Sequence, residues 1–281
     1  MVLCGCARAD TPSTTEILHL DCRGEPSAAP TVILESGLFG TASDWDRVLD
    51  NLAKGGRTCA YDRAGLGRSP PRPGGEDVVS IAQELHGLVE RMGETRPVIL
   101  VGHSNGALYV EAFAAMWPKQ VAGLVYVNGV TSDDLDYPVL IHDLVKERGL
   151  ANLAVSGARL GLAPLIADVV TGASGLTGQA ALDKRRALGN LAHLSVARDE
   201  DLAMIPGLST VRGLGGAPPG IPLAVIVGAV DPASELAKAW RAAGVAAAAR
   251  AQSSWMLDAN GATHTSPLVR DRPMSRRRSA G

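Results

Sequence analysis

The stretch PVILVGHSNG, residues 97–106, carries the strongest structural signal in the sequence. Residues 98–101 form a continuous apolar run, which is typical of a strand that is buried on both faces. After Gly106, apolar side chains recur at helical spacing as far as Met116, and Pro118 ends this helix. Ser104 is therefore predicted to lie on a sharp turn between a strand and a helix, near the positive end of the helix.

The glycines on either side of Ser104 have a physical explanation. The backbone around a serine on such a turn is crowded, and Gly102 and Gly106 remove side chains that would clash there. The pattern Gly-x-Ser-x-Gly alone is weak evidence, because this composition gives roughly 0.2 chance occurrences in a chain of this length. The alternative is a glycine-rich connection with an idle serine, and the flanking strand and helix favour a nucleophile.

Strands and helices alternate along most of the chain. Further strands are predicted at residues 16–20, 31–34, 57–61, 121–127, 222–227 and 252–257. Helices are predicted between them at residues 43–52, 76–92 and 234–243. This alternation predicts an α/β protein with a mostly parallel sheet that is covered by helices on both faces.

Residues 131–220 separate two of these strands and contain leucine and valine at helical spacing. We expect them to form a helical cap, whose helices should be short because glycine and proline are frequent between residues 161 and 178. Most of its apolar residues are expected to form the cap's own core. The predicted domains are a core of residues 14–130 and 221–270, the cap of residues 131–220, and flexible tails at residues 1–13 and 271–281.

The composition excludes several classes of protein. Hydrophobic residues make up 46% and charged residues 20% of the chain, as in ordinary globular proteins. A net charge of -2 and an aromatic content of 4% do not favour nucleic-acid binding. No apolar run approaches the roughly 18 residues that a transmembrane helix needs. We therefore expect no nucleic-acid partner and no transmembrane segment.

The four cysteines are Cys4, Cys6, Cys22 and Cys59. Their spacing matches neither a zinc site nor a disulfide scaffold, and Cys59 is interpreted as a small buried strand residue. The residues around Cys4 resemble the end of a bacterial lipoprotein signal, although the apolar segment that should precede it is missing. The sequence as written predicts a cytoplasmic protein, whereas a truncated signal would predict an exported protein or a lipoprotein.

A serine hydroxyl needs a base within hydrogen-bond reach to act as a nucleophile. Among the six histidines, His264 is the best candidate, because it follows the last predicted strand on a loop that can reach the sheet edge. His103 should point away from the turn, and His142 and His193 are expected at the surface or in the core of the cap. Of the remaining histidines, His19 precedes all the strand-end loops and His86 lies within a predicted helix.

A carboxylate should orient this base. Asp231 directly follows the strand at residues 222–227 and is expected at the same end of the sheet as Ser104. Its competitors, Asp133 and Asp134, follow the strand at residues 121–127, where Asn128 lies closest to the strand end. Asp258 is too near His264 in the sequence to reach it easily.

The order Ser104, Asp231, His264 resembles that of the α/β-hydrolase superfamily. Two loops extend the resemblance: ESGLFG at residues 35–40 and YDRAGLGRS at residues 61–69. The resemblance implies an eight-stranded type of sheet with a helical cap between the sixth and seventh strands. It also implies an oxyanion hole formed by the backbone N–H groups of Leu38 and Asn105. In the second loop, Asp62 and Arg63 are expected to brace neighbouring loops.

Ester cleavage is the most frequent reaction of serine members of this family, so the resemblance implies a carboxylesterase that acts on a small or medium, apolar ester. Such chemistry requires no metal and no organic cofactor. The same residues would also serve a thioesterase, lactonase, amidase or carbon–carbon bond hydrolase, and a non-catalytic ligand-binding member is a further alternative. Two departures from the family pattern are expected: a reduced first strand and a short last helix.

Overall fold

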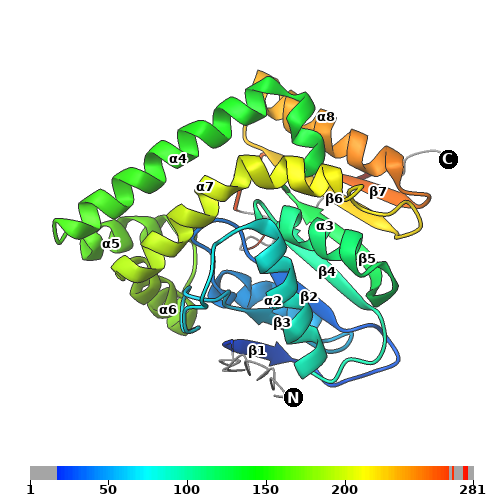
Figure 1. Ribbon diagram of the computed structural model, residues 1–281, viewed down its shortest axis with the longest axis horizontal. Coiled ribbons are helices and arrows are strands. Elements are labelled where there is room, and N and C mark those ends of the chain that lie inside the picture. The colour runs from blue at the N-terminus through cyan, green and yellow to red at the C-terminus, as the bar shows by residue number, and fades with distance from the viewer. Residues whose placement is uncertain (1–17, 266–267, 269–274, 278–281) are drawn as a thin grey trace, which may run out of the picture.

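The computed structural model describes residues 18–265, Leu268 and residues 275–277, and Figure 1 shows their arrangement around one sheet. The strands lie in the spatial order β1-β3-β2-β4-β5-β6-β7-β8. Their bounds are β1 Leu20–Arg23, β2 Val32–Glu35, β3 Thr58–Tyr61, β4 Val98–His103, β5 Val121–Val127, β6 Leu223–Ala229, β7 Ser254–Asn260 and β8 Ser275–Arg277. The outer strands β1 and β8 pair antiparallel, and all the others pair parallel. The predicted α/β class and the mostly parallel sheet are confirmed.

Alternating side chains of the central strands enter two separate cores. Ile33 and Leu100 belong to the larger core, whereas the next residues, Leu34 and Val101, belong to a second core with Leu49. This follows from the pleat of a strand, which directs successive side chains to opposite faces. A parallel sheet buried on both faces therefore requires continuous apolar strands, as the sequence has here.

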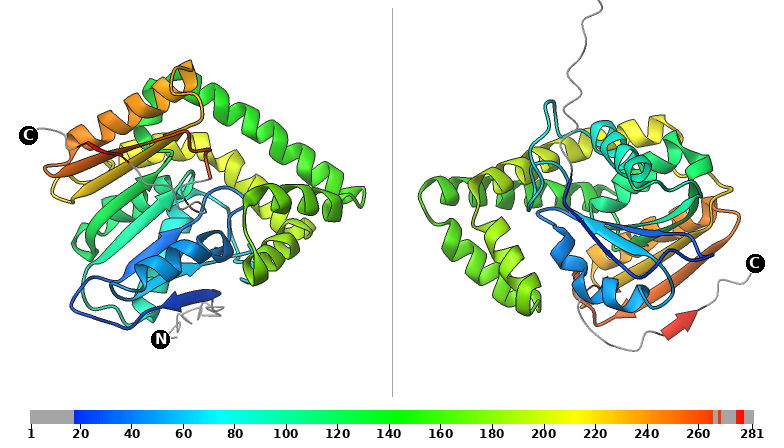
Figure 2. Two further views of the ribbon diagram at one scale, coloured as in Figure 1. Left: turned by 180° about the vertical axis from the view of Figure 1, so that it is seen from behind. Right: turned by 90° about the horizontal axis from the view of Figure 1, so that it is seen from below.

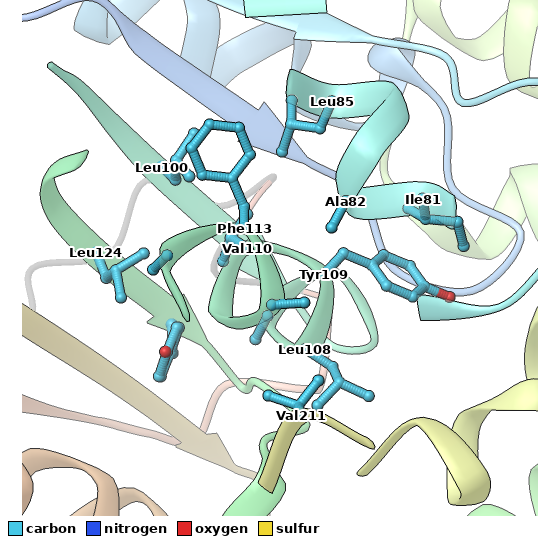
Figure 3. Close-up of a cluster of buried hydrophobic side chains, with 14 of the residues drawn as sticks. Ile81, Ala82, Leu85, Leu100, Leu108, Tyr109, Val110, Phe113, Leu124 and Val211 are labelled. Carbon is cyan, nitrogen blue, oxygen red and sulfur yellow. The ribbon is translucent and has the colours of Figure 1, made fainter. Parts of the chain in front are cut away.

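The larger core lies under helices α2 (Val78–Arg91), α3 (Gly106–Met116) and α8 (Glu235–Arg250), and the smaller one under α1 (Asp46–Leu52). Figure 3 shows side chains of α2 and α3 meeting those of the central strands. The helix α2 begins where the Asp77 carboxylate accepts hydrogen bonds from the N–H groups of Val79 and Ser80.

The order of the strands reverses between β2 and β4. From β2 the chain moves to β3 on one side, and it then returns to place β4 on the other side of β2. The loops that leave these two strands diverge and form a crevice at the carboxyl end of the sheet. The Ser104 turn and the loop of residues 36–40 both begin at this crevice.

Four helices lie between β5 and β6: α4 (Pro138–Arg159), α5 (Ala163–Ser174), α6 (Gly178–Leu188) and α7 (Leu191–Gly213). We call them the helical insert, and Figures 1 and 2 show that they project beyond the sheet on one side. The described residues before β2 contain one strand, so the insert follows the fifth strand of the described chain rather than the sixth. Among the described residues, every helix is too short or too polar to cross a membrane.

The expectation of short insert helices is wrong for α4 and α7, which have 22 and 23 residues. Gly161 and Gly175 adopt positive φ and lie after the ends of α4 and α5, so these glycines separate helices rather than shorten them. Pro206 lies inside α7, and the guanidinium of Arg148 contacts the Leu202 carbonyl one turn earlier at 3.5 Å. Such a contact compensates for the helical hydrogen bond that a proline cannot donate.

The insert has a small core of its own, formed by Val155, Ala158, Ala163, Ala167, Leu188 and Leu194, but many of its larger apolar side chains remain exposed. The exposed leucines and valines of α4, α5 and their connection are Val139, Val145, Leu150, Leu153, Leu160, Leu162, Leu165, Val169 and Val170. Helical spacing predicts that such residues share a face, but it does not show whether another element covers that face.

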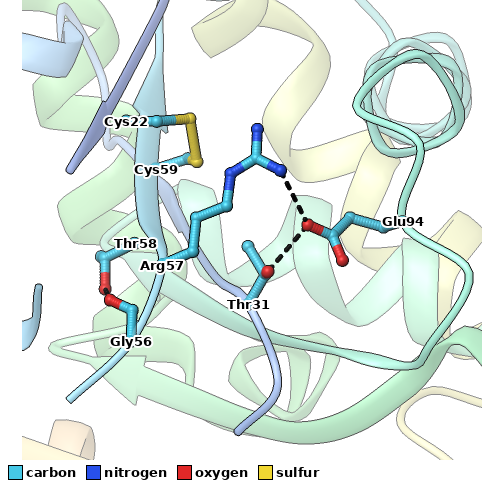
Figure 4. Close-up of a disulfide and its surroundings, with 7 residues drawn as sticks. All are labelled: Cys22, Thr31, Gly56, Arg57, Thr58, Cys59 and Glu94. Atoms are coloured by element: carbon cyan, nitrogen blue, oxygen red, sulfur yellow. Dashed lines mark hydrogen bonds and ion pairs between the residues drawn. A yellow bond between two sulfur atoms is a disulfide. The ribbon is translucent and has the colours of Figure 1, made fainter. Parts of the chain in front are cut away.

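Cys22 and Cys59 form a disulfide, which corrects the interpretation of the cysteines (Figure 4). The two residues lie directly opposite each other in the antiparallel pair β1–β3, with their Cα atoms 4.0 Å apart. Cys59 is buried in a strand as predicted. The sequence does not identify Cys22 as its partner, because two cysteines 37 residues apart give no indication that their strands pair in this register. Cys4, Cys6 and the predicted tails, apart from residues 275–277, lie outside the described residues.

Some element boundaries differ from the prediction. The first strand begins at Leu20 rather than residue 16, and residues 16 and 17 lie outside the described residues. The last predicted strand corresponds to β7, shifted by about two residues, and α8 extends to Arg250. The alanine-rich end of α8 packs on the sheet through Ala247 and Ala248, a pattern that leucine spacing alone does not reveal.

Candidate active site

Ser104 connects β4 to α3 and has a φ of 53°. This left-handed conformation is uncommon for a residue with a side chain. The neighbouring backbone leaves no room for other residues at the flanking glycines: a Cβ on Gly102 would lie 2.4 Å from the Ala107 Cα, and a Cβ on Gly106 would lie 2.5 Å from the Glu35 carbonyl oxygen. The turn therefore has the geometry of a nucleophile elbow.

The loop of residues 36–40, which we call the oxyanion loop, packs directly against this turn. A Cβ on Gly37 would lie 2.8 Å from the Cβ of Ser104. Among the described residues, neither the Leu38 N–H nor the Asn105 N–H donates a hydrogen bond to another residue. A backbone N–H group without a protein acceptor can donate to a bound ligand.

His264 lies beyond β7 and is fixed through its backbone. Its carbonyl oxygen accepts a hydrogen bond from Asn128 Nδ2 at 2.9 Å and lies 3.1 Å from His103 Nε2. The two imidazole rings are 5.0 Å apart between centroids. The His264 side chain is accessible to solvent, yet the protein packed around it and the neighbouring His103 lower its pKa, while the Asp143 carboxylate acts in the opposite direction.

Asp231 lies in the exposed loop between β6 and α8. Its Oδ1 accepts a hydrogen bond from the Ala233 N–H at 3.0 Å, and its carbonyl accepts one from Ser234 Oγ at 2.9 Å. The loops that carry Asp231 and His264 start side by side, because Ala229 pairs with the end of β7. No hydrogen bond of the described residues joins the side chains of Ser104, Asp231 and His264 in this structure.

The alternative carboxylates are engaged elsewhere. Asp133 forms an ion pair with Arg250, and Asp134 is buried with its Oδ1 next to the Thr131 hydroxyl. Burial raises the pKa of Asp134 to about 8. Asp258 forms an ion pair with Arg241. None of these groups contacts His264 through a hydrogen bond among the described residues.

Two residues near His264 have roles that the sequence did not indicate. Asn128 has a φ of 44° and connects the end of β6 to the loop after β7, because its Oδ1 accepts from the Gly228 N–H at 2.6 Å while its Nδ2 donates to the His264 carbonyl. The sequence places Asn128 at the end of the strand at residues 121–127, but it does not indicate these hydrogen-bond partners. Burial lowers the pKa of His103 to about 4, and the Lys184 ammonium adds to this effect. His103 is therefore neutral near pH 7.

A cavity of about 480 Å³ lies between the oxyanion loop and the insert. Most of the side chains that the insert contributes to its wall are aliphatic: Ala154, Ile166, Val169, Val170, Leu176, Leu188 and Leu194. Trp45 and His103 form part of the opposite wall. Lys184 also lines it, but its ammonium is paired with Asp44 at 2.7 Å and with the Phe39 carbonyl at 2.9 Å. The cavity is therefore suited to an apolar group.

Arg63 is buried behind the oxyanion loop. Its guanidinium donates hydrogen bonds to the carboxylates of Glu35 and Glu200 and to the carbonyls of Ser36 and Gly37. The sequence predicts a bracing role for Arg63, but it does not indicate that Glu200 of the insert is the partner. Residues 18–265 bring together no group of three or more histidine, cysteine or acidic side chains that could hold a metal ion.

Comparisons with known proteins agree with this geometry. The alpha/beta hydrolase fold family matches residues 30–173. The protein named "Putative carbamate hydrolase RutD" of Stutzerimonas stutzeri is 35% identical over 118 residues, which are 41% of this chain and 44% of that protein. The chain thus spans less than half the length of this curated relative.

Solved structures match over most of the chain. A mutant of a "putative epoxide hydrolase" from Pseudomonas aeruginosa has a TM-score of 0.68 at 19% identity and covers 89% of this chain and 87% of its own. A carboxylesterase structure from Nitrososphaera gargenis has a TM-score of 0.65 at 18% identity, with 92% and 91% covered. The elbow, the parallel sheet and the family match together show that the chain is a hydrolase-fold protein and belongs to the alpha/beta hydrolase family.

Proposed function

We propose that this protein is a serine hydrolase that cleaves a carboxylic ester through an acyl-enzyme. The observation that carries the proposal is the left-handed Ser104 turn beside the backbone N–H groups of Leu38 and Asn105, neither of which has an acceptor among the described residues. A hydroxyl in this position can attack an acyl carbon while the two N–H groups stabilise the oxyanion that forms. Ester cleavage is the most frequent reaction of serine enzymes with this fold, which favours an ester.

In the proposed mechanism, His264 removes the proton from Ser104 and later gives it to the leaving alcohol. Asp231 orients the imidazole and stabilises its charged form. Support for these roles is positional: His264 lies next to His103, which precedes Ser104, and the loops of Asp231 and His264 leave adjacent strands. Catalysis would require the His264 side chain to turn towards Ser104 and Asp231. Contact with the Asp231 carboxylate would then raise the pKa of the His264 imidazole.

The cavity supports an apolar substrate of small or medium size. The oxyanion loop forms one wall and the aliphatic side chains of the insert form the other, so one apolar part of the substrate would occupy the cavity while the ester carbonyl lies at Ser104. The Ser104 hydroxyl distinguishes the proposed reaction from epoxide opening, which needs a carboxylate nucleophile in this family.

A carbamate is the second candidate substrate, because the RutD relative is named as a carbamate hydrolase. Carbamates and esters share a carbonyl that a serine can attack, and they differ in their leaving groups. Comparing hydrolysis rates of a phenyl ester and of a carbamate with the same alcohol would decide between them.

The test is to react the protein with a fluorophosphonate, locate the adduct by mass spectrometry, and assay a series of p-nitrophenyl esters. We expect an adduct on Ser104 and a loss of at least about a thousandfold in kcat for Ser104→Ala. An unlabelled Ser104, or a mutant as active as the parent, would contradict the proposal and favour a non-catalytic binding protein.

The base is tested with a matched pair of histidine variants. His264→Ala should lose fluorophosphonate labelling, because the Ser104 hydroxyl then has no proton acceptor. His142→Ala is the control, since His142 is an exposed residue of α4. Equal labelling of the two variants would rule out His264 as the base.

A further inference from the structure

All five N–H donors of Arg63 are used, and they join the oxyanion loop to the helical insert. Nε and Nη2 each donate to one carboxylate oxygen of Glu200 at 2.7 Å. Nη1 donates to Glu35 Oε1 and to the Ser36 carbonyl, both at 2.6 Å, and Nη2 also donates to the Gly37 carbonyl at 3.1 Å. A planar guanidinium with five donors can make this set of contacts, whereas a lysine ammonium cannot.

The contact with the Gly37 carbonyl has a geometric consequence for the adjacent residue. The Gly37 C=O and the Leu38 N–H belong to one peptide group, which is planar and trans. Fixing the direction of the carbonyl therefore fixes the direction of the N–H, which points the opposite way. The Gly40 N–H also donates to the Gly37 carbonyl, at 3.0 Å, and closes the turn.

Glu200 connects this peptide to the insert. It lies on α7, and the side chains of Glu200 and Arg63 are 0% and 1% exposed. Two parallel hydrogen bonds hold the guanidinium in one plane relative to α7. We propose that Arg63 is a positioning residue that orients the Leu38 N–H of the oxyanion hole, and that Glu200 makes this orientation depend on the placement of the insert.

A role in stability alone explains the arrangement less well. Replacing a buried ion pair with apolar residues is often neutral or stabilising, because the cost of removing two charges from water offsets their attraction. The Arg63 guanidinium also lies 5.1 Å from the centre of the Tyr109 ring, which packs against its face. These neighbours hold the guanidinium in the orientation that reaches two consecutive carbonyls of the oxyanion loop.

The inference rests on the proposed ester hydrolysis and is tested with two variants, Arg63→Lys and Glu200→Gln. We expect kcat for p-nitrophenyl acetate to fall roughly ten- to a hundredfold, with KM changed by less than about twofold, because the misplaced donor acts on the transition state. Affinity for phenylboronic acid, which forms a tetrahedral adduct on serine, should fall in proportion to kcat/KM.

Glu111→Gln is the matched control. Glu111 is also a fully buried carboxylate with an arginine partner, Arg250, but it accepts hydrogen bonds from Ser132 rather than from a residue that contacts the oxyanion loop. This variant should keep kcat and boronic acid affinity within about twofold of the parent, even if it unfolds at a lower temperature. A loss of kcat equal to that of Glu200→Gln would show a general effect of neutralising buried charge and would overturn the inference.

The rate of fluorophosphonate labelling separates the two proposals. An unlabelled parent contradicts the proposed function itself. A labelled parent, with variants that label and turn over at the parental rate, contradicts only the role of Arg63 and Glu200. If Arg63→Lys does not fold, Glu200→Gln decides the outcome alone, because it preserves the size of the side chain.

Discussion

At the scale of single residues, Ser104 adopts a conformation that costs about 1–2 kcal/mol for an L-residue. Its own backbone groups are all engaged: its N–H donates to the Val127 carbonyl at 3.1 Å, and its carbonyl accepts from the N–H groups of Ala107 and Val130. These bonds to the adjacent strand and to the next turn hold the backbone in place. Phe39 and Asn128 also have positive φ, so the strained residues of the described chain include two neighbours of the elbow as well as Ser104 itself.

Gly106→Ala should destabilise the protein by several kcal/mol, because the added Cβ would lie 2.5 Å from the Glu35 carbonyl oxygen. Gly149→Ala is the matched control: Gly149 is an exposed residue within α4, and its Cβ would meet no atom within 4 Å. It should stabilise the protein by about 0.5–1 kcal/mol. Urea unfolding measures both, and equal stabilities would contradict the crowding of the turn.

The buried His193 should lower the free energy of unfolding in acid. It is buried, its Nδ1 accepts a hydrogen bond from the Gly67 N–H at 3.1 Å, and burial lowers its pKa from 6.5 to about 3. The unfolded chain therefore binds a proton below pH 6.5 that the folded protein excludes. Its contribution to stability is present above pH 6.5 and is lost as the pH falls towards 3.

The slope from this one group reaches about 1.4 kcal/mol per pH unit below its unfolded pKa. His193→Asn retains an acceptor near Nδ1 and cannot titrate. Urea unfolding of parent and variant is compared between pH 6.5 and about 5, a range in which most carboxylates stay ionised. The free energy of unfolding should depend less steeply on pH in the variant. Parallel curves for the two proteins would show that His193 does not control this loss.

At the scale of elements, β1 pairs with the described part of the sheet on one side only. The strand β1 pairs antiparallel with β3 over four residues, and it is the outer strand of the sheet. A short outer strand has few hydrogen bonds to keep it in register. The disulfide between Cys22 and Cys59 closes this pair covalently.

Reducing this disulfide should lower the free energy of unfolding by about 2–4 kcal/mol, because the unfolded chain loses a cross-link over 37 residues. Thermal unfolding with and without dithiothreitol measures the effect. The double variant Cys22→Ser with Cys59→Ala should be insensitive to the reductant. An equal response of the parent and the double variant would mean that the bond is absent in solution.

At the scale of the whole molecule, the cavity exists only because the insert lies over the oxyanion loop. One wall comes from residues 36–45 and the opposite wall from α4, α5, α6 and α7. Lys184 of α6 links the two by its bonds to Asp44 and Phe39, and Arg63 with Glu200 links them behind the loop. The shape of the cavity therefore depends on the two parts together.

Ala154→Trp should shorten the range of accepted acyl chains, because Ala154 lines the cavity and an indole would fill part of it. We expect kcat/KM for p-nitrophenyl octanoate to fall at least about tenfold relative to the acetate. Leu153→Trp is the control, since Leu153 is 68% exposed on the adjacent position of α4. An unchanged ratio in Ala154→Trp would place the acyl chain elsewhere.

The sequence alone determined the class of fold and the position of the elbow. Continuous apolar strands require a sheet buried on both faces, and the glycines around Ser104 fit a turn too crowded for side chains. These are local properties, because each depends on residues within one strand, turn or helix. The loops at residues 35–40 and 61–69 added the resemblance to the family.

Only the tertiary structure decided which distant groups meet. The Cys22–Cys59 register, the Glu200 partner of Arg63 and the Asn128 contact with His264 each join residues far apart in the chain. Periodicity likewise predicted apolar faces in the insert without showing that many stay exposed. Such pairings depend on how elements pack, and the spacing of residues along one element carries no information about the partner that will cover it.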